Sequence, residues 1–148
     1  MDCDGVLTDG RLYFSALGEE MKVFHVRDGQ GLVSWHKAGF RSGIISGRNS
    51  PIVEMRGKQL GVEFIVQGRN EKIGPLNEIA AAACVDLDEI AYIGDDVPDA
   101  AVMSLAGFAA AVADAVDEAK SVAHYVTRTK GGCGAVREVI DLLLAAKN

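Results

Sequence analysis

Carboxylates are crowded into two short segments of the sequence. The chain begins MDCDGVLTDGR, in which Asp2 and Asp4 flank a cysteine, and a later segment, GDDVPD, contains Asp95, Asp96 and Asp99. Carboxylate oxygens are hard ligands suited to Mg²⁺. One carboxylate could attack a phosphorus atom and form an aspartyl-phosphate. A second, two residues along, could protonate the leaving oxygen and then activate water.

Two further segments would complete such a site. Ser46, Gly47 and Arg48 form a short polar turn, and Lys72 follows the loop QGRNE. A hydroxyl and backbone N–H groups can hold phosphate oxygens, and a lysine can neutralise phosphoryl charge. Taken singly, each segment has a plainer interpretation as a turn, a helix start or a surface lysine. Their combination, each after an expected strand, favours one shared site.

Alternating strands and helices would bring these segments together. Ser50 and Pro51 mark a helix start, and apolar spacing marks the others. Strands are predicted over 40–46, 62–66, 89–93, 108–112 and 123–126, and helices over 28–39, 50–60, 71–83, 97–105, 114–121 and 135–146. This order predicts an α/β domain, a doubly wound parallel sheet with helices on both faces. Ligands bind such sheets beyond the carboxyl ends of the strands.

One stretch interrupts the alternation. Arg11 to Val26 (RLYFSALGEEMKVFHV) reads as two strands around a turn at 17–20, which predicts a β-hairpin inserted after the first acidic loop. A projecting hairpin has open edges that favour pairing with another chain.

Composition narrows the class of protein. The 148 residues suit a single domain, and the formal net charge of −6 argues against nucleic-acid binding. We expect no membrane span, because no apolar run approaches the roughly 20 residues required, and no signal peptide. Three widely spaced cysteines show no metal-binding pair, which favours a reducing cytoplasm.

The order of the motifs resembles that of the haloacid dehalogenase (HAD) superfamily. DGVLTDG, VRDGQG, SGR, GDDVPD, AVADA and AHYVTRTKGGCGAVREV resemble segments of its cap-less branch, the 3-deoxy-D-manno-octulosonate 8-phosphate (KDO 8-phosphate) phosphatases. The resemblance implies one Rossmann-like HAD domain over residues 1–148 with no cap domain. It implies a Mg²⁺-dependent phosphomonoesterase that hydrolyses KDO 8-phosphate in lipopolysaccharide biosynthesis, as a homotetramer built through the Arg11 to Val26 hairpin.

The resemblance also implies a role for each matching residue. Asp2 would be the nucleophile and a metal ligand, and Asp4 the general acid/base whose main-chain carbonyl also binds the metal. Ser46 would hold the phosphoryl group, Lys72 would stabilise nucleophile and phosphate, and Asp95 would bind the metal directly. Asp96 and Asp99 would be supporting groups around the metal. Gly47 and Arg48 would contact the substrate.

Two departures from the family's pattern bear on these roles. The family has an apolar strand before its first acidic motif, whereas only Met1 precedes Asp2, so we expect the first core strand to be truncated at the N-terminus. In addition, Cys133 occupies a position that is usually arginine in the segment GGRGAVRE. If that arginine helps to hold the sugar acid, affinity or specificity would differ.

Three other functions are considered. A phosphatase for N-acylneuraminate or other nonulosonate 9-phosphates would use the same domain. A non-catalytic assembly module is the alternative suggested by the short start. A receiver domain of a response regulator is disfavoured, because its acid pair precedes an aspartate on a later strand and it has no place for the hairpin.

Overall fold

The computed structural model describes residues 1–147, and the strands from β3 to β7 lie in parallel ladders at the centre of the molecule. β3 (Gly43–Ile45) pairs with β4 (Phe64–Val66). β6 (Phe108–Ala111) pairs with β5 (Ala91–Gly94) on one side and with β7 (Tyr125–Val126) on the other. The predicted parallel α/β arrangement is therefore confirmed.

The first two residues connect these two ladders. The amino group of Met1 donates to the carbonyl of Gly43, and the amide of Ile45 donates to the carbonyl of Met1, both at 3.0 Å. On the other side, the amide of Asp2 donates to the carbonyl of Ile93 at 3.0 Å. The backbone of Met1 and Asp2 thus lies between β3 and β5 and places Asp2 at the carboxyl end of the sheet.

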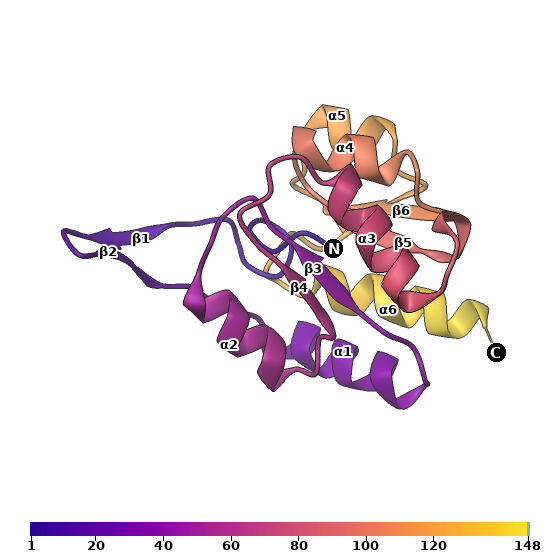
Figure 1. Cartoon of the computed structure of the whole chain (residues 1–148), viewed down its shortest axis with the longest axis horizontal. Helices are drawn as coiled ribbons and strands as arrows, with labels where there is room; N and C mark the ends of the chain where they lie inside the picture. Colours follow the sequence, from indigo (N-terminus) through magenta and orange to yellow (C-terminus); the bar gives the residue numbers. More distant parts are fainter. Residues whose placement is uncertain (148) are drawn as a thin grey trace.

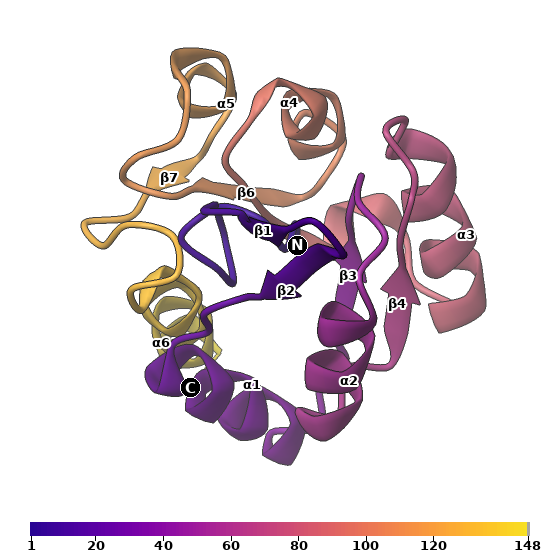
Figure 2. The same cartoon turned by 90° about the vertical axis from the view of Figure 1, so that its left-hand side faces the viewer.

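Six helices cover the two faces of the sheet within residues 1–147. Figure 2 shows α1, α2 and α6 on one face and α3, α4 and α5 on the other. Their bounds are α1 (Val26–Lys37), α2 (Pro51–Gln59), α3 (Ile73–Ala83), α4 (Val97–Met103), α5 (Asp117–Ser121) and α6 (Ala135–Ala146), with a 3₁₀ turn, η1 (Leu87–Glu89), before β5.

The predicted elements are all present, with changes at their ends. The helix predicted over 135–146 matches α6, whereas the helix predicted from residue 28 begins at Val26, because the side chain of His25 accepts from the amide of Arg27 and caps it. Ser50 precedes α2 as predicted, but its hydroxyl donates to Glu19 rather than capping the helix.

The predicted hairpin projects from the body of the molecule (Figure 1). It consists of β1 (Tyr13–Ser15) and β2 (Gly18–Met21). The turn predicted at 17–20 was placed too late, because Ser15 already pairs with Gly18. The second arm was predicted too long, since beyond β2 the pairing among the described residues continues only as an antiparallel bridge between Thr8 and Phe24.

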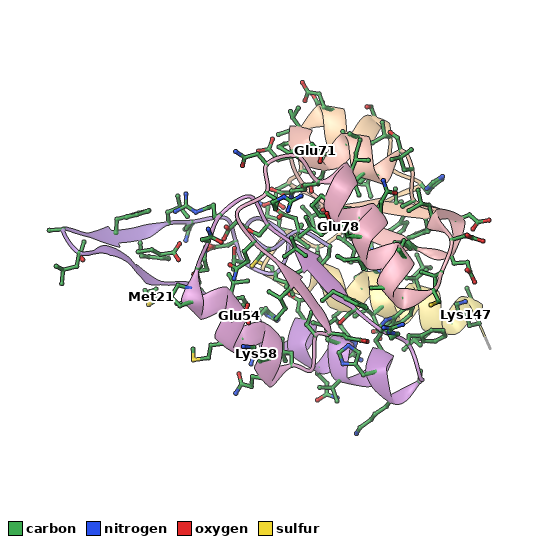
Figure 3. All side chains as sticks on the ribbon, viewed as in Figure 1. Met21, Glu54, Lys58, Glu71, Glu78 and Lys147 are labelled. Carbon is green, nitrogen blue, oxygen red and sulfur yellow. The ribbon has the colours of Figure 1, made fainter. Side chains whose placement is uncertain are left out.

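Polar side chains cover the outer faces of the helices. Figure 3 shows Glu54 and Lys58 on α2 near the lower left edge of the molecule, and Glu78 on α3, which faces the viewer, is exposed. Tyr92, Leu32 and other large side chains fill the interior between helices and sheet. Within residues 1–147, the helices are too short or too polar to cross a membrane.

Candidate active site

Three carboxylates meet at the carboxyl end of the sheet. Asp2 follows the backbone that joins β3 to β5, Asp95 follows β5, and Asp99 lies in the first turn of α4. Each offers a carboxylate oxygen within 4.8 Å of the other two. The parallel topology therefore unites acids that are more than 90 positions apart in sequence.

Lys72 is the cation inside this acidic cluster. Its Nζ donates to Asp2 Oδ1 at 2.9 Å and to Asp99 Oδ1 at 2.7 Å. Only 5% of the residue is exposed. Burial alone would lower the pKa of Lys72, but the two carboxylates outweigh it and raise that pKa, so the ammonium form is retained.

Asp99 fixes the geometry around this lysine. Besides the contact with Lys72, its Oδ1 accepts from the hydroxyl of Tyr92 at 2.9 Å, and its Oδ2 accepts from the amides of Asp95 and Asp96 at 3.1 and 3.3 Å. The residue is fully buried. With both oxygens engaged, Asp99 positions Lys72 and the loop that carries Asp95.

The carboxylates of Asp2 and Asp95 both have raised pKa values. Burial raises the pKa of Asp2, although Lys72 offsets part of the effect. Burial, followed by repulsion from Asp2 and Asp99, raises the pKa of Asp95 to about 8. Asp95 Oδ1 is buried and has no hydrogen-bond partner among the described residues. A buried, unpartnered carboxylate oxygen beside a second carboxylate fits a hard divalent cation such as Mg²⁺.

Glycines allow the acidic loops to approach each other. Gly5 has a φ of +92°, and a Cβ there would lie 2.0 Å from Asp95 Oδ2. A Cβ on Gly131 would lie 1.6 Å from the carbonyl oxygen of Gly5. The loop that contains Cys133 therefore packs against the first acidic loop, and Cys133 itself is exposed.

Asp4 lies in a separate charged group beside the acidic cluster. Lys22 Nζ donates to Asp4 Oδ1 and lies 3.0 Å from Glu19 Oε1. Arg48 Nε lies 3.9 Å from Asp4 Oδ2, which has no hydrogen-bond partner among the described residues. One oxygen of Asp4 is thus held by a lysine, and the other lies buried near Arg48 without a hydrogen-bond partner in the described part of the chain.

Ser46, Gly47 and Arg48 follow β3 at the same end of the sheet. Ser46 is 1% exposed, and its hydroxyl oxygen accepts from the amide of Arg48 at 3.3 Å. A Cβ on Gly47 would lie 2.8 Å from Asn70 Oδ1, so a side chain there would require Asn70 to shift. The guanidinium of Arg48 lies 5.6 Å from the ring centroid of Phe14 on β1.

The structure brings together Asp2, Lys72, Asp95 and Asp99, four of the residues that the sequence predicts for the site. Asp96 is placed differently: it is exposed, and its side chain accepts from the amide of Val97 to cap α4. Although Asp96 follows Asp95 in sequence, its side chain therefore lies outside the cluster of acids.

Sequence reasoning missed several functional candidates. Lys22, Glu19 and Tyr92 contact predicted site residues only because the hairpin and β5 fold against them. The only signal in the sequence is that Lys22 and Glu19 are charged residues within a hairpin that carries apolar side chains. Tyr92 gives no signal, because its position in a strand predicts only packing.

Comparisons with known proteins identify the family of this chain. A family model for haloacid dehalogenase-like hydrolases matches residues 32–140. The KDO 8-phosphate phosphatase KdsC of Yersinia pestis is 44% identical over 147 residues, which cover 99% of this chain and 79% of that protein. KdsC of Escherichia coli K12 is 42% identical, with 99% and 78% covered.

Solved structures of KDO 8-phosphate phosphatases are also similar to this chain. The KDO 8-phosphate phosphatase of Moraxella catarrhalis, in complex with magnesium, phosphate and KDO, has a TM-score of 0.95 and 40% identity, with 98% of this chain and 83% of that chain covered. The enzyme from Yersinia pestis has a TM-score of 0.96 and 44% identity, with 99% and 79% covered.

Fold and site together define a haloacid dehalogenase-like hydrolase. Within that class, the chain belongs to the KDO 8-phosphate phosphatase family.

Proposed function

We propose that this protein is a Mg²⁺-dependent phosphomonoesterase that hydrolyses KDO 8-phosphate to KDO and inorganic phosphate. The observation that carries the proposal is the buried contact of Asp2 with Lys72, next to an unpartnered oxygen of Asp95. The relative that was solved with magnesium, phosphate and KDO supports the choice of substrate. We take residues 1–148 as one HAD-like domain.

Asp2 acts as the nucleophile in this proposal. Its carboxylate oxygen forms a bond to phosphorus while the bond from phosphorus to the sugar oxygen breaks. Asp4 gives a proton to that leaving oxygen and so becomes a carboxylate. It then takes a proton from water, whose oxygen attacks phosphorus and releases phosphate and free Asp2. Lys72 offsets the negative charge that Asp2 and the phosphoryl group share.

The site residues fit a bound cation. Asp2, Asp95 and the main-chain carbonyl of Asp4 would hold Mg²⁺, with Asp99 and the α4 cap at Asp96 in supporting positions. When bound, Mg²⁺ supplies positive charge that reduces repulsion between the carboxylates and the phosphate. A cation would also relieve the cost of ionising Asp95 in its buried position.

The turn after β3 would bind the substrate. Ser46 and the backbone amide of Gly47 would hold phosphoryl oxygens in this proposal, since both follow β3 at the carboxyl end of the sheet. Arg48, whose side chain is 43% exposed and lies close to Asp4, would contact the sugar acid in this proposal. A cation there would favour the substrate's carboxylate over neutral sugar phosphates.

We further propose a cytoplasmic homotetramer that forms through the hairpin. Its apolar side chains are unusually exposed, at 57% for Phe14, 97% for Leu17 and 49% for Met21. Contiguous exposed apolar groups on an open-edged hairpin favour association. Replacing Leu17 and Phe14 with aspartate should lower the molecular mass measured by sedimentation, and an unchanged mass would mean that the interface lies elsewhere.

Phosphate release tests the function directly. The protein should release phosphate from KDO 8-phosphate with Mg²⁺ and lose this activity with a chelator. N-acetylneuraminate 9-phosphate is the matched competitor substrate. A higher kcat/KM for the competitor would overturn the choice of substrate, and no release from any sugar-acid phosphate by the folded protein would overturn the enzymatic function.

A further inference from the structure

Four charged side chains join the hairpin to the first acidic loop. Lys22 directly follows β2, and its side chain is only 1% exposed. Its Nζ donates to Asp4 Oδ1 and lies 3.0 Å from Glu19 Oε1. Arg48 lies 3.9 Å from Asp4 and 3.8 Å from Glu19. Burying an ammonium group is costly unless it is paired and hydrogen-bonded, so these two carboxylates are what keep Lys22 in its buried position.

The backbone around Lys22 is fixed on both sides. Before it, β2 pairs with β1. After it, Phe24 forms an antiparallel bridge with Thr8, whose buried hydroxyl accepts from the amide of Gly5 at 3.4 Å. The loop that carries Asp4 therefore also anchors the segment that carries Lys22.

Glu19 holds the lysine from the side of α2. Its Oε2 accepts from the hydroxyl of Ser50, which precedes α2, at 2.6 Å. The amide of Ser50 donates in turn to Gln67 Oε1, after β4, at 2.9 Å. The base of the hairpin accordingly lies beside the start of α2 (Figure 1). These contacts connect Lys22 to the body of the molecule and restrict a side chain that would otherwise have many rotamers.

The two oxygens of Asp4 consequently have different surroundings. Oδ1 accepts from the ammonium group of Lys22, which is a donor only. Oδ2 is buried, lies 3.9 Å from Arg48 Nε and has no hydrogen-bond partner among the described residues. In the proposed function Arg48 contacts the sugar acid, and the leaving oxygen belongs to that sugar. Oδ2 therefore faces the side of the site on which the leaving oxygen would lie.

We propose that Lys22, held by Glu19, is a positioning residue for Asp4. Because Lys22 occupies Oδ1, Oδ2 is the oxygen that exchanges protons. Oδ2 gives its proton to the leaving sugar oxygen as the bond from that oxygen to phosphorus breaks. It then takes a proton from the water molecule whose oxygen bonds to phosphorus. The hairpin thus sets the geometry of proton transfer, an inference that rests on the proposed phosphatase function.

Steady-state kinetics of Lys22→Met with KDO 8-phosphate test this role. Methionine keeps much of the length of the side chain and removes the ammonium group. Since a misplaced acid/base group costs about a hundredfold in rate, kcat should fall by about 30–100-fold. KM and the Kd for Mg²⁺ should change by less than about threefold, because Lys22 contacts neither ligand in the proposal. Lys58→Met is the matched control, since Lys58 lies on the exposed side of α2 and should leave kcat unchanged.

A double-mutant cycle separates positioning from a direct role. Asp4→Asn removes the proton-transfer group and should lower kcat by about 10²–10⁴-fold. Because Lys22 acts through Asp4, adding Lys22→Met to Asp4→Asn should lower kcat further by less than about twofold. Losses that multiply would show that Lys22 acts on the reacting groups by itself, and they would overturn the positioning role.

The leaving group supplies a readout that a general distortion of the site would not reproduce. 4-Nitrophenyl phosphate releases a stable phenolate that needs no proton. The burst of nitrophenolate from Lys22→Met should therefore keep its rate within about threefold of the unmodified protein. Formation of the aspartyl-phosphate from KDO 8-phosphate, followed by rapid quench, should slow by the full factor. Equal slowing with both substrates would overturn the proposal.

Glu19→Gln is a second variant, and it decides if Lys22→Met does not fold. Glutamine keeps an acceptor for Ser50 but removes the charge that holds Lys22, so the rate with KDO 8-phosphate should fall by about three- to tenfold. The burst with 4-nitrophenyl phosphate should be retained. A Glu19→Gln rate equal to that of the unmodified protein would overturn the proposal. Hydrolysis of neither phosphate by the unmodified protein would instead overturn the proposed function itself.

Discussion

Replacing Asp95 with asparagine should stabilise the metal-free protein at neutral and alkaline pH. The pKa of Asp95 is about 8 in the fold against an ordinary value of 3.8, so the folded state holds this proton more tightly than the unfolded state does. Stability from this group is therefore complete below about pH 4 and is lost as the pH rises toward 8. An asparagine side chain carries no charge at any of these pH values, so Asp95→Asn removes this loss.

The magnitude follows from the size of the pKa change. One pKa unit corresponds to about 1.4 kcal/mol, so the full difference sets an upper bound of about 6 kcal/mol at pH 8. Asp95 is partly exposed, and solvent screening reduces the expected gain to about 2–4 kcal/mol. Near pH 4 the gain should be close to zero.

Urea unfolding in chelator at pH 4.5 and pH 8 measures this difference. The gain in the free energy of unfolding for Asp95→Asn should grow with pH, and added Mg²⁺ should stabilise the unmodified protein but not Asp95→Asn. Asp96→Asn is the control for the pH dependence, because asparagine serves this exposed cap equally well and its change in the free energy of unfolding should not grow with pH. An Asp95→Asn gain that is the same at both pH values would refute the reasoning.

Three further substitutions test other contacts. Gly5→Ala should lower the free energy of unfolding by about 1–3 kcal/mol and weaken Mg²⁺ binding measured by calorimetry, because the added Cβ would clash with Asp95. Gly39→Ala is the control, since Gly39 also has a positive φ but lies in open space, and it should leave Mg²⁺ binding unchanged. Equal Mg²⁺ affinities of the two variants would contradict this prediction. Lys72→Met should lower the free energy of unfolding by about 3–5 kcal/mol and abolish turnover, since it leaves Asp2 and Asp99 buried without their cation. Lys58→Met, at an exposed ion pair, should lower it by only about 0.5 kcal/mol. Similar losses of stability in the two variants would contradict this prediction. Glu138 has a pKa of about 2, because backbone and side-chain donors from residues 125–129 outweigh its burial, so its stabilisation is present above about pH 4.5 and is lost toward pH 2. Glu138→Gln should lose about 1–2 kcal/mol at pH 6 and much less at pH 2.5 in urea titrations, and a loss that does not depend on pH would count against that role.

The sequence predicted the order of the elements because the physical signals were local. Apolar spacing in 135–146 and the pair Ser50 with Pro51 mark helix positions without reference to the rest of the chain. The hairpin turn was placed wrongly because Gly18, with a φ of +112°, begins β2 rather than lying inside the turn. Strand pairing decided that position, and pairing is not visible in a single segment.

The sequence predicted those site residues whose positions depend only on where strands end. Asp2, Lys72 and Asp95 each follow a strand or its extension, so parallel topology alone brings them together. Tyr92 and Lys22 could not be predicted in this way, because their roles arise from the direction of side chains in the folded state. The position of Met1 between β3 and β5 likewise depends on hydrogen bonds to residues more than 40 positions away.

The most direct test of the central claim is to trap the phosphorylated protein during turnover. The protein would be mixed with KDO 8-phosphate and Mg²⁺, quenched in acid within milliseconds, and its N-terminal peptide examined by mass spectrometry. The account predicts a labile phosphoryl group on Asp2, which is absent from Asp2→Asn. Turnover by Asp2→Asn at the rate of the unmodified protein, or a phosphoryl group on another residue, would contradict it.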